Sequence, residues 1–382
     1  MGRLHTRRGR IALGLVGAAA LVLAACSPNN KQNAASPHGT NAHRIDNLIL
    51  PIWGVAIVIG LIVIGAVGYL AIRYRVRPGG NDRPRQIHGN LAVEIAWTII
   101  PAIILAVIAV PTVALIFKTD AAAPANALPV TVVGKQWWWE FEYPGSSGRP
   151  AVVTADELHI PTGRDVDLSL QACDPSLPYG ANGGPGCNVI HSFWVPELAG
   201  KRDVVPGRTN HLTLRSDSPG TYQGQCAQYC GLSHANMRFR VIVQRPADFD
   251  AWLAGQRQGP AVPVAGAGSA AQLFTGTFQC TNCHTTANPS ISTYGPNLTH
   301  LASRGTFASG YFQLTKAKLV EWILNAPGLI PMQSAECRRG PPGTPGVTCV
   351  GMPSFTLNTP KGLPTMTRAQ AETIADYLLS LQ

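Results

Sequence analysis

The second half of this 382-residue chain contains two groups of potential metal ligands. The first group has two cysteines four residues apart, a histidine and a methionine after them, and another histidine upstream: Cys226, Cys230, His234, Met237 and His191. Two thiolates on one loop can bridge a pair of copper ions, with an imidazole for each ion and a thioether as a weak axial ligand. A mononuclear site needs only one cysteine, so the spacing favours a dinuclear copper centre. The alternative, a disulfide between the two cysteines, leaves both histidines and the methionine unexplained.

The second group is the pentapeptide C-T-N-C-H, which runs from Cys280 to His284. Its thiols, Cys280 and Cys283, can bond the vinyl groups of a haem, with His284 as an axial ligand. A zinc half-site or a redox dithiol is the alternative, but no second cysteine pair has zinc spacing. The sixth iron ligand should be a methionine before the last helix. Met352 is the best placed, and Met332 and Met366 are less suitably placed. With no obvious substrate-pocket motif, the two sites together predict electron transfer.

The formal net charge of +10 is concentrated near the N-terminus. Residues 1–86 contain eleven Lys/Arg and two Asp/Glu, beside long apolar segments. Basic residues in this arrangement are typical of membrane topology, whereas nucleic-acid-binding proteins carry a basic patch on a folded domain. No nucleic-acid partner is therefore expected.

Residues 27–120 predict a transmembrane hairpin, with helices at about 48–72 and 91–117, each long enough to span a bilayer of ~30 Å. The connecting loop carries five arginines and one aspartate. The positive-inside rule places such a loop in the cytoplasm, so both flanking regions are expected outside. Buried core helices are the alternative.

Residues 1–26 predict a secretory signal peptide, because four arginines precede an apolar run. The segment ends in L-A-A-C at Cys26, which resembles the bacterial lipoprotein processing box, where the cysteine is acylated. The alternatives are an ordinary signal peptide, or an uncleaved helix, with an incidental cysteine.

Residues 128–245 are dense in β-formers separated by Pro and Gly turns, which predicts an all-β sandwich. Alternation should turn Trp138 away from Trp137 and Trp139, so at least one indole is expected to be exposed and to serve as an electron port. His159 and His211 are expected to be ordinary strand or surface residues.

Residues 246–268 are assigned to a linker, which ends in a low-complexity Pro/Ala/Gly run. Residues 269–382 predict a small helical domain, with helices at 271–278, 315–324 and 367–381, the last opened by a T-x-x-Q capping box. A flexible linker would turn electron transfer between the two domains into an intramolecular encounter, at an effective concentration in roughly the millimolar range.

Four further cysteines form two pairs, Cys173 with Cys187 and Cys337 with Cys349, and each pair brackets a Pro/Gly-rich loop. In an exported protein they are expected to be structural disulfides, each contributing on the order of 3 kcal/mol. Additional metal ligation is the alternative.

Several motifs together resemble bacterial cytochrome c oxidase subunit 2 in the caa-type form, which has a cytochrome c domain fused at its C-terminus. They are E-I-A-W-T-I-I-P-A, G-K-Q-W-W-W-E-F-E-Y-P, H-S-F-W-V-P-E-L-A-G-K-R-D-V-V-P-G-R, the copper motif, G-P-N-L-T-H-L-A-S-R and M-P-S-F. The resemblance implies two transmembrane helices, a cupredoxin sandwich with the dinuclear copper centre CuA, and an all-α class I cytochrome c domain with haem c.

The resemblance also assigns roles to individual residues. The implied CuA ligands are His191, Cys226, Gln228 through its main-chain carbonyl, Cys230, His234 and Met237. The implied haem c residues are Cys280, Cys283, His284 and Met352. Trp137 matches the tryptophan that receives electrons, and Glu94 matches a glutamate at the mouth of a proton channel shared with subunit 1. Pro296 matches the proline whose carbonyl accepts the N–H of the axial histidine.

Two positions depart from the family pattern. Many members have Glu at position 228, where the carboxylate also binds magnesium, and Gln228 lacks that charge. Asn188 stands where an Asp often precedes the His-Ser motif, which weakens the case for docking a basic soluble cytochrome c.

The resemblance implies a subunit that passes electrons from an external donor, such as a cytochrome bc complex or a cytochrome c, through haem c and CuA to subunit 1. There oxygen is reduced, coupled to proton translocation. Subunit 3 is a further expected partner. The expected location is the bacterial cell membrane, with both large domains on the outer face. The alternatives are a CuA-bearing subunit of a nitric oxide reductase and a stand-alone membrane-anchored electron carrier.

Overall fold

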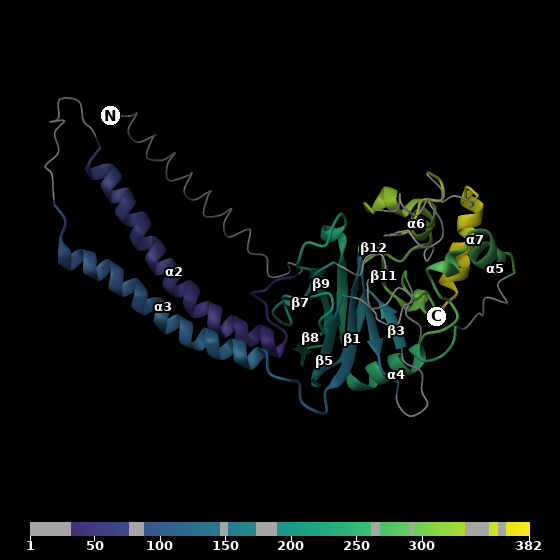
Figure 1. Ribbon diagram of the computed structural model, residues 1–382, viewed down its shortest axis with the longest axis horizontal. Coiled ribbons are helices and arrows are strands. Elements are labelled where there is room, and N and C mark those ends of the chain that lie inside the picture. Colours follow the sequence, from purple (N-terminus) through teal and green to yellow (C-terminus); the bar gives the residue numbers. More distant parts are fainter. Residues whose placement is uncertain are drawn as a thin grey trace, which may run out of the picture.

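The chain folds into three consecutive parts (Figure 1). A computed structural model describes residues 32–75, 88–145, 152–172, 189–260, 268–290, 294–332, 351–357 and 364–382. A pair of long helices projects from one side of a β-sandwich, and a C-terminal domain with short helices lies on the other side. The sandwich therefore connects the helix pair to the C-terminal domain.

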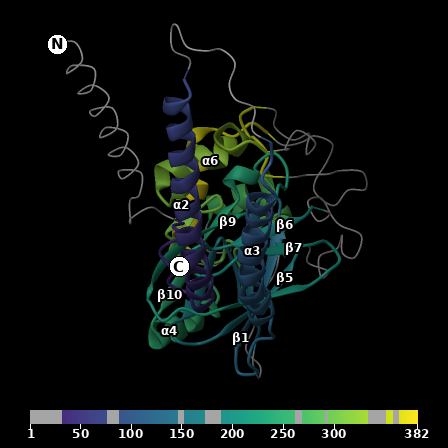
Figure 2. The same ribbon diagram turned by 90° about the vertical axis from the view of Figure 1, so that its left-hand side faces the viewer.

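The two long helices, α2 (Thr40–Arg73) and α3 (Leu91–Thr119), run side by side (Figure 2). Both are long and apolar enough to cross a membrane, and most of their large apolar side chains are exposed. Asn90 caps α3, because its side chain accepts hydrogen bonds from the amides of Ala92 and Val93. The predicted helix pair is confirmed. Helix α2 begins at Thr40, before the expected position 48, so its first turns consist mostly of polar residues.

The sandwich consists of two five-stranded sheets. The first has the order β3-β2-β1-β5-β8 and the second the order β4-β10-β9-β6-β7. The strands of the first sheet are β1 (Leu128–Lys135), β2 (Trp138–Tyr143), β3 (Val152–Ala155), β5 (Val166–Gln171) and β8 (Asn210–Leu214). Those of the second are β4 (Glu157–Pro161), β6 (His191–Trp194), β7 (Arg202–Val204), β9 (Gly220–Cys226) and β10 (Arg238–Gln244).

Alternating side chains build the core between the sheets. In β5, Val166, Leu168 and Leu170 are fully buried while the residues between them are partly exposed, as expected for a half-buried strand. Gly224 is needed in β9, because a side chain there would overlap the ring of Phe239 on the neighbouring strand β10. The predicted all-β sandwich is confirmed.

The expected exposed tryptophan is not found. Trp137, Trp138 and Trp139 are all buried, with 7%, 7% and 0% of their surface exposed. Trp138 does point away from the core, but the ammonium of Lys135 lies 4.9 Å from the centre of its ring. Trp137 precedes β2 and packs against the loop that carries the copper-ligand candidates.

Part of the expected linker is a helix. Residues Pro246–Gln256 form α4, which packs Phe249 and Leu253 into the sandwich core. This helix was not predicted, because its apolar residues lack a strong one-sided period. Residues 261–267 lie outside the described residues.

The C-terminal domain contains two longer helices, α6 (Lys316–Leu329) and α7 (Arg368–Leu379), which pack against each other. Its other elements are α5 (Ser269–Ala271), η3 (Gln272–Thr277), η4 (Cys280–Asn282), η5 (Leu301–Ser303), and the hairpin strands β11 (Thr306–Phe307) and β12 (Phe312–Gln313). The predicted helices are present, and the Thr367 capping box opens α7 as expected.

The C-terminal domain packs directly on the sandwich. The amide of Val153 donates to the carbonyl of Pro289 over 2.7 Å, and Met332 packs against the sandwich core. The sandwich and the C-terminal domain therefore form an interface, whereas the sequence predicted two domains that meet only transiently through a flexible linker.

Candidate metal centre

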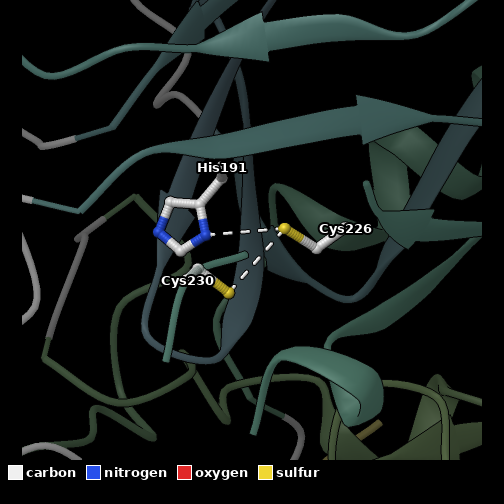
Figure 3. A group of neighbouring side chains, drawn as sticks. All are labelled: His191, Cys226 and Cys230. Carbon is white, nitrogen blue, oxygen red and sulfur yellow. Dashed lines mark hydrogen bonds between the residues drawn. The ribbon is translucent and has the colours of Figure 1, made fainter. Parts of the chain in front are cut away.

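A buried cluster of two cysteines and one histidine lies at the end of β9 (Figure 3). The ligand atoms of His191, Cys226 and Cys230 all lie within 4.8 Å of one another. The Sγ atoms of the two cysteines are 3.8 Å apart, and Nδ1 of His191 is 3.8 Å from Sγ of Cys226. All three side chains are almost fully buried. This donor set is soft, as copper prefers.

The other three expected copper ligands lie around the same two thiols. Nδ1 of His234 is 3.5 Å from Sγ of Cys230, and Sδ of Met237 is 3.8 Å from the same sulfur. The carbonyl oxygen of Gln228 is 3.2 Å from Sγ of Cys226. Each thiol therefore has its own histidine, which is the arrangement that a bridged pair of copper ions requires.

The strand framework explains why these residues meet. His191 opens β6, and β6 pairs with β9 so that Phe193 lies opposite Cys226. The loop between Cys226 and Met237 is closed at its base, because the amide of Cys226 donates to the carbonyl of Met237 over 2.9 Å. Gly231 turns the loop with a φ of 108°, a conformation that favours glycine.

The two thiols are electrostatically unequal. The pKa of Cys226 is lowered because the thiol of Cys230 donates a hydrogen bond to its thiolate, and the pKa of Cys230 is raised by the same contact. One thiolate is thus favoured before any metal binds, and a cation is needed to hold both thiolates together.

Residues around the cluster fix its loop and its histidine. The indole N–H of Trp137 and the side-chain amide of Gln136 both donate to the carbonyl of Cys230, over 2.9 and 2.6 Å. The ring of Trp139 packs edge-on against the ring of His191, with 5.9 Å between the ring centres. A side chain on Gly134 would come within 3.0 Å of the His191 ring. Gln136 and Gly134 were not among the expected site residues, because only the packing of the two sheets brings Gly134 of β1 against His191 of β6, and Gln136 against the carbonyl of Cys230.

The residues expected to hold haem also lie together. Cys280 and Cys283 are free thiols at either end of a single 3-10 turn, and the amide of His284 donates to the carbonyl of Cys280. Nδ1 of His284 is 2.8 Å from the carbonyl oxygen of Pro296, as the resemblance implied. Burial lowers the pKa of His284, which favours the neutral imidazole that a ligand requires.

The three methionine candidates occupy different surroundings. Met352 and Cys280 both pack against the apolar core of the C-terminal domain. Met366 is fully inside that core, and Met332 packs against the sandwich instead. Met352 and Cys280 therefore share one apolar core, whereas Met332 lies against the other domain.

The remaining expected site residues lie elsewhere. Glu94 is in the first turn of α3, and its carboxylate lies beside Gly89. His159 is buried in β4, where it stacks on Trp252, and His211 is exposed on β8. Cys26, Asn188, and the cysteines of the two expected disulfides lie outside the described residues.

Two family models match the chain. The one described as "Cytochrome C oxidase subunit II, transmembrane domain" matches residues 26–115, and the one described as "Cytochrome C oxidase subunit II, periplasmic domain" matches residues 185–244. The first match includes α2 and part of α3, which identifies the helix pair as a membrane anchor. The second match covers the copper-ligand candidates.

Individual relatives agree with the family models. Cytochrome c oxidase subunit 2 of Alkalihalophilus pseudofirmus is 34% identical over 310 residues, which is 79% of this chain and 84% of that protein. The protein of the same description from Bacillus sp. (strain PS3) is 33% identical over 272 residues, covering 65% of this chain and 70% of that protein.

Among solved structures, the periplasmic domain of subunit II of cytochrome oxidase from Bradyrhizobium japonicum is 25% identical, with a TM-score of 0.29. The match covers 35% of this chain and 96% of that one. The family assignment rests on the sequence matches. The chain belongs to the cytochrome c oxidase subunit 2 family.

Proposed function

We propose that this subunit receives electrons from an external respiratory donor on a haem c held by its C-terminal domain. The electrons then pass through a CuA centre in the sandwich to subunit 1, where oxygen is reduced. The observation that supports this proposal best is the convergence of His191, Cys226, Cys230, His234, Met237 and the carbonyl of Gln228 at one place. These residues would hold two copper ions.

A dinuclear copper centre, when bound, accepts and releases one electron at a time with little change in its ligands. The chain's own residues provide the conditions for this chemistry. The thiols of Cys226 and Cys230 are buried, so the surrounding protein keeps water away from them. The hydrogen bonds from Gln136 and Trp137 to the carbonyl of Cys230 hold the loop in place. A rigid ligand set lowers the reorganisation that accompanies each transfer.

The C-terminal domain would hold a c-type haem through Cys280, Cys283 and His284, with Met352 as the sixth ligand. A Met/His pair, when the haem is bound, raises the reduction potential and leaves no open site, which suits electron transfer. The bond between His284 and Pro296 sets the orientation and tautomer of the imidazole. The packing of Cys280 and Met352 on one apolar core supports this assignment.

The remaining proposed roles concern the membrane and the partners. Trp137 would be the residue through which electrons reach CuA, and Glu94 would lie at a proton channel shared with subunit 1. Subunit 3 and a cytochrome bc complex or cytochrome c would be further partners, in a bacterial cell membrane with both large domains on the outer face. Cys26 would carry a lipid, Cys173 would bond Cys187, and Cys337 would bond Cys349. Magnesium is not proposed, because position 228 lacks a carboxylate.

Replacing Cys230 with Ser tests the copper assignment. The wild-type chain, matured with haem and copper, should show a low-spin c-type haem spectrum and the near-infrared absorption of mixed-valence copper. Cys230→Ser should abolish the near-infrared band and leave the haem spectrum unchanged, because the two sites use separate residues. Thr373→Ala, on the exposed face of α7, is a control that should keep both signals. A near-infrared band that persists in Cys230→Ser would overturn the assignment.

Purification in mild detergent distinguishes this function from its alternatives. A haem-copper subunit should accompany the chain, and the complex should consume oxygen in a cyanide-sensitive reaction. A complex that reduces nitric oxide and not oxygen would indicate a nitric oxide reductase. A solitary chain with both cofactors would indicate a free-standing electron carrier.

A further inference from the structure

A short β-hairpin of the C-terminal domain reaches into the sandwich. This docking hairpin consists of β11, β12 and the turn between them, residues 306–313. Three consecutive turn residues, Ala308, Ser309 and Gly310, have φ values of 53°, 56° and 68°. Two of the three are not glycine, and such a turn persists only where its surroundings hold it. The turn backbone lies against β10, since a side chain on Gly310 would be 3.9 Å from Cα of Phe239.

Two neighbouring acids of the sandwich, Asp156 and Glu157, bind this hairpin and are called the docking acids. Oδ1 of Asp156 accepts a hydrogen bond from the amide of Trp139 over 2.9 Å, and Oδ2 accepts one from the amide of Ser309 over 3.0 Å. Oε1 of Glu157 accepts hydrogen bonds from the amide and the hydroxyl of Thr306, over 3.1 and 3.0 Å. Asp156 thus joins a sandwich strand to the hairpin through one carboxylate.

The docking acids are buried at the interface, with 5% and 4% of their surface exposed. Burying a carboxylate is costly unless hydrogen bonds and an opposite charge compensate for the lost water. Arg304, just before the hairpin, interacts electrostatically with both docking acids and also donates to the carbonyl of Asn297. The C-terminal domain therefore supplies donors and a positive charge to acids of the sandwich.

The same hairpin contacts the tryptophan beside the copper-ligand cluster. The hydroxyl of Ser309 donates to the carbonyl of Trp137 over 2.5 Å, and the indole N–H of Trp137 donates to the carbonyl of Cys230 over 2.9 Å. These contacts connect the C-terminal domain, through one residue, to a copper-ligand candidate. Trp137 is only 7% exposed.

Two further contacts join the C-terminal domain to the sandwich. The guanidinium of Arg238 lies 5.3 Å from the centre of the Tyr311 ring. The hydroxyl of Ser233, the residue before His234, donates to the carbonyl of Pro331. The loop between Cys226 and Met237 is called the copper loop. The C-terminal domain therefore contacts the copper loop as well as Trp137.

We infer that Asp156 and Glu157 form an intramolecular docking site that holds the hairpin against Trp137 and reserves this tryptophan for the chain's own C-terminal domain. Ser309 is then a positioning residue that acts through Trp137. An external donor has no access to Trp137 in this arrangement and must instead reduce the C-terminal domain. The inference rests on the proposed function, in which a haem c held by Cys280, Cys283 and His284 would give up one electron and the copper pair held by the sandwich would gain it, with no bond formed or broken.

Hydrogen exchange on the full-length chain in detergent tests the docking site. The amides of Thr306 and Ser309 should be protected in the wild type. In Glu157→Ala their exchange should accelerate roughly tenfold or more, because charge-assisted hydrogen bonds are lost. The amide of Ala371 in α7 should not change. Glu372→Gln, which removes a negative charge from the exposed face of α7, is the matched control.

A second pair of variants covers the case in which Glu157→Ala does not fold. Ser309→Gly removes the hydroxyl at a position whose φ suits glycine, and Thr306→Val removes the other hydroxyl without changing the shape of the side chain. Both variants leave the sandwich sequence unchanged. Unprotected Thr306 and Ser309 amides in the wild type, or unchanged protection in all folded variants, would overturn the docking site.

Electron transfer gives an independent readout of the positioning role. After photoreduction of haem c, reduction of copper should be roughly tenfold slower in Ser309→Gly than in wild type or Glu372→Gln, since one connecting hydrogen bond is lost. An unchanged rate would overturn the role of Ser309. Absence of the haem or copper spectrum would contradict the proposed function instead, whereas intact spectra with unprotected hairpin amides would contradict only the docking site.

Discussion

Single residues control the geometry of both candidate metal sites. In the copper loop, Gly231 supplies a left-handed turn and Cys226 bonds to Met237 at the base of the loop. In the C-terminal domain, Gly295 lies directly against the ring of His284. The ligands themselves were predicted from their residue types and their spacing in the sequence. The glycines that hold them were not, because a close approach between two segments is visible only in three dimensions.

Replacing Gly295 with Ala should disturb the proposed haem site. The new methyl group would overlap Cε1 of His284, so the imidazole would have to shift and its 2.8 Å bond to the carbonyl of Pro296 would lengthen. We expect a loss of low-spin haem in the absorption spectrum, with copper absorption unchanged, because the hydrogen bond to Pro296 orients the imidazole of His284. Gly276→Ala is the control, since its methyl group would meet open space. Equal haem spectra in the two variants would refute this role of Gly295.

The secondary-structure elements differ in how well their sequences identify them. The capping box of α7 was expected from Thr367 and Gln370, and both of its hydrogen bonds are present. Strands β1, β2, β5, β8 and β10 matched β-rich segments of the sequence, whereas the four-residue strand β6 and the three-residue strand β7 had no such signal. Helix α4 was missed because its stability comes from packing Phe249 and Leu253 on the sandwich.

The attachment of α4 to β4 should make the sandwich sensitive to acid. His159 stacks on Trp252 of α4 at 3.9 Å and pairs with Gln244 over 2.9 Å. Burial lowers the pKa of His159 from 6.5 to about 4. Between pH 6.5 and about 4, the unfolded chain therefore binds a proton at His159 that the folded chain does not. The contribution of His159 to the free energy of unfolding falls as the pH decreases through this range, and it changes no further below about 4. Over this range the loss should reach up to about 3 kcal/mol.

Thermal unfolding of the chain between pH 7 and pH 4 would measure this effect. In His159→Phe, which keeps a ring against Trp252, the midpoint temperature should fall less on acidification than in the wild type. His211→Gln, at an exposed position on β8, should behave like the wild type. Parallel pH profiles for the wild type and His159→Phe would exclude His159 as the acid-sensitive group.

At the scale of the whole molecule, the sandwich is held on two sides. On one side, the start of α2 and the residues before it form hydrogen bonds with the sandwich. The amides of His38 and Gly39 donate to the carbonyl of Glu197, and the amide of Thr40 donates to the carbonyl of Arg215. On the same side, Asp120 at the end of α3 pairs with Arg202. On the other side the docking hairpin occupies the docking acids. The orientation of the copper site relative to the membrane helices is thus fixed by specific contacts.

Replacing Gly39 with Ala should loosen the attachment of α2. A methyl group at this position would overlap the carbonyl oxygen of Leu198, and backbone atoms there cannot move aside easily. We expect a local destabilisation of about 1–3 kcal/mol, typical of overpacking. Hydrogen exchange at the amides of His38 and Thr40 should accelerate accordingly. Gly54→Ala, whose methyl group would project into open space from α2, should leave these amides protected.

Local features of the sequence were enough to predict the chemistry and the class of each part. Ligand types and spacing predicted copper and haem sites, apolar length predicted the membrane helices, and β-formers predicted the sandwich. These features are local, so a short stretch of sequence contains them. How the parts meet follows only from the packing in three dimensions: the burial of Trp137, the position of Gln136 at the carbonyl of Cys230 and of Gly134 at the ring of His191, and the hairpin bound by Asp156 and Glu157. Such contacts join residues far apart in the chain, and their energy depends on packing and loss of water, which no local pattern encodes.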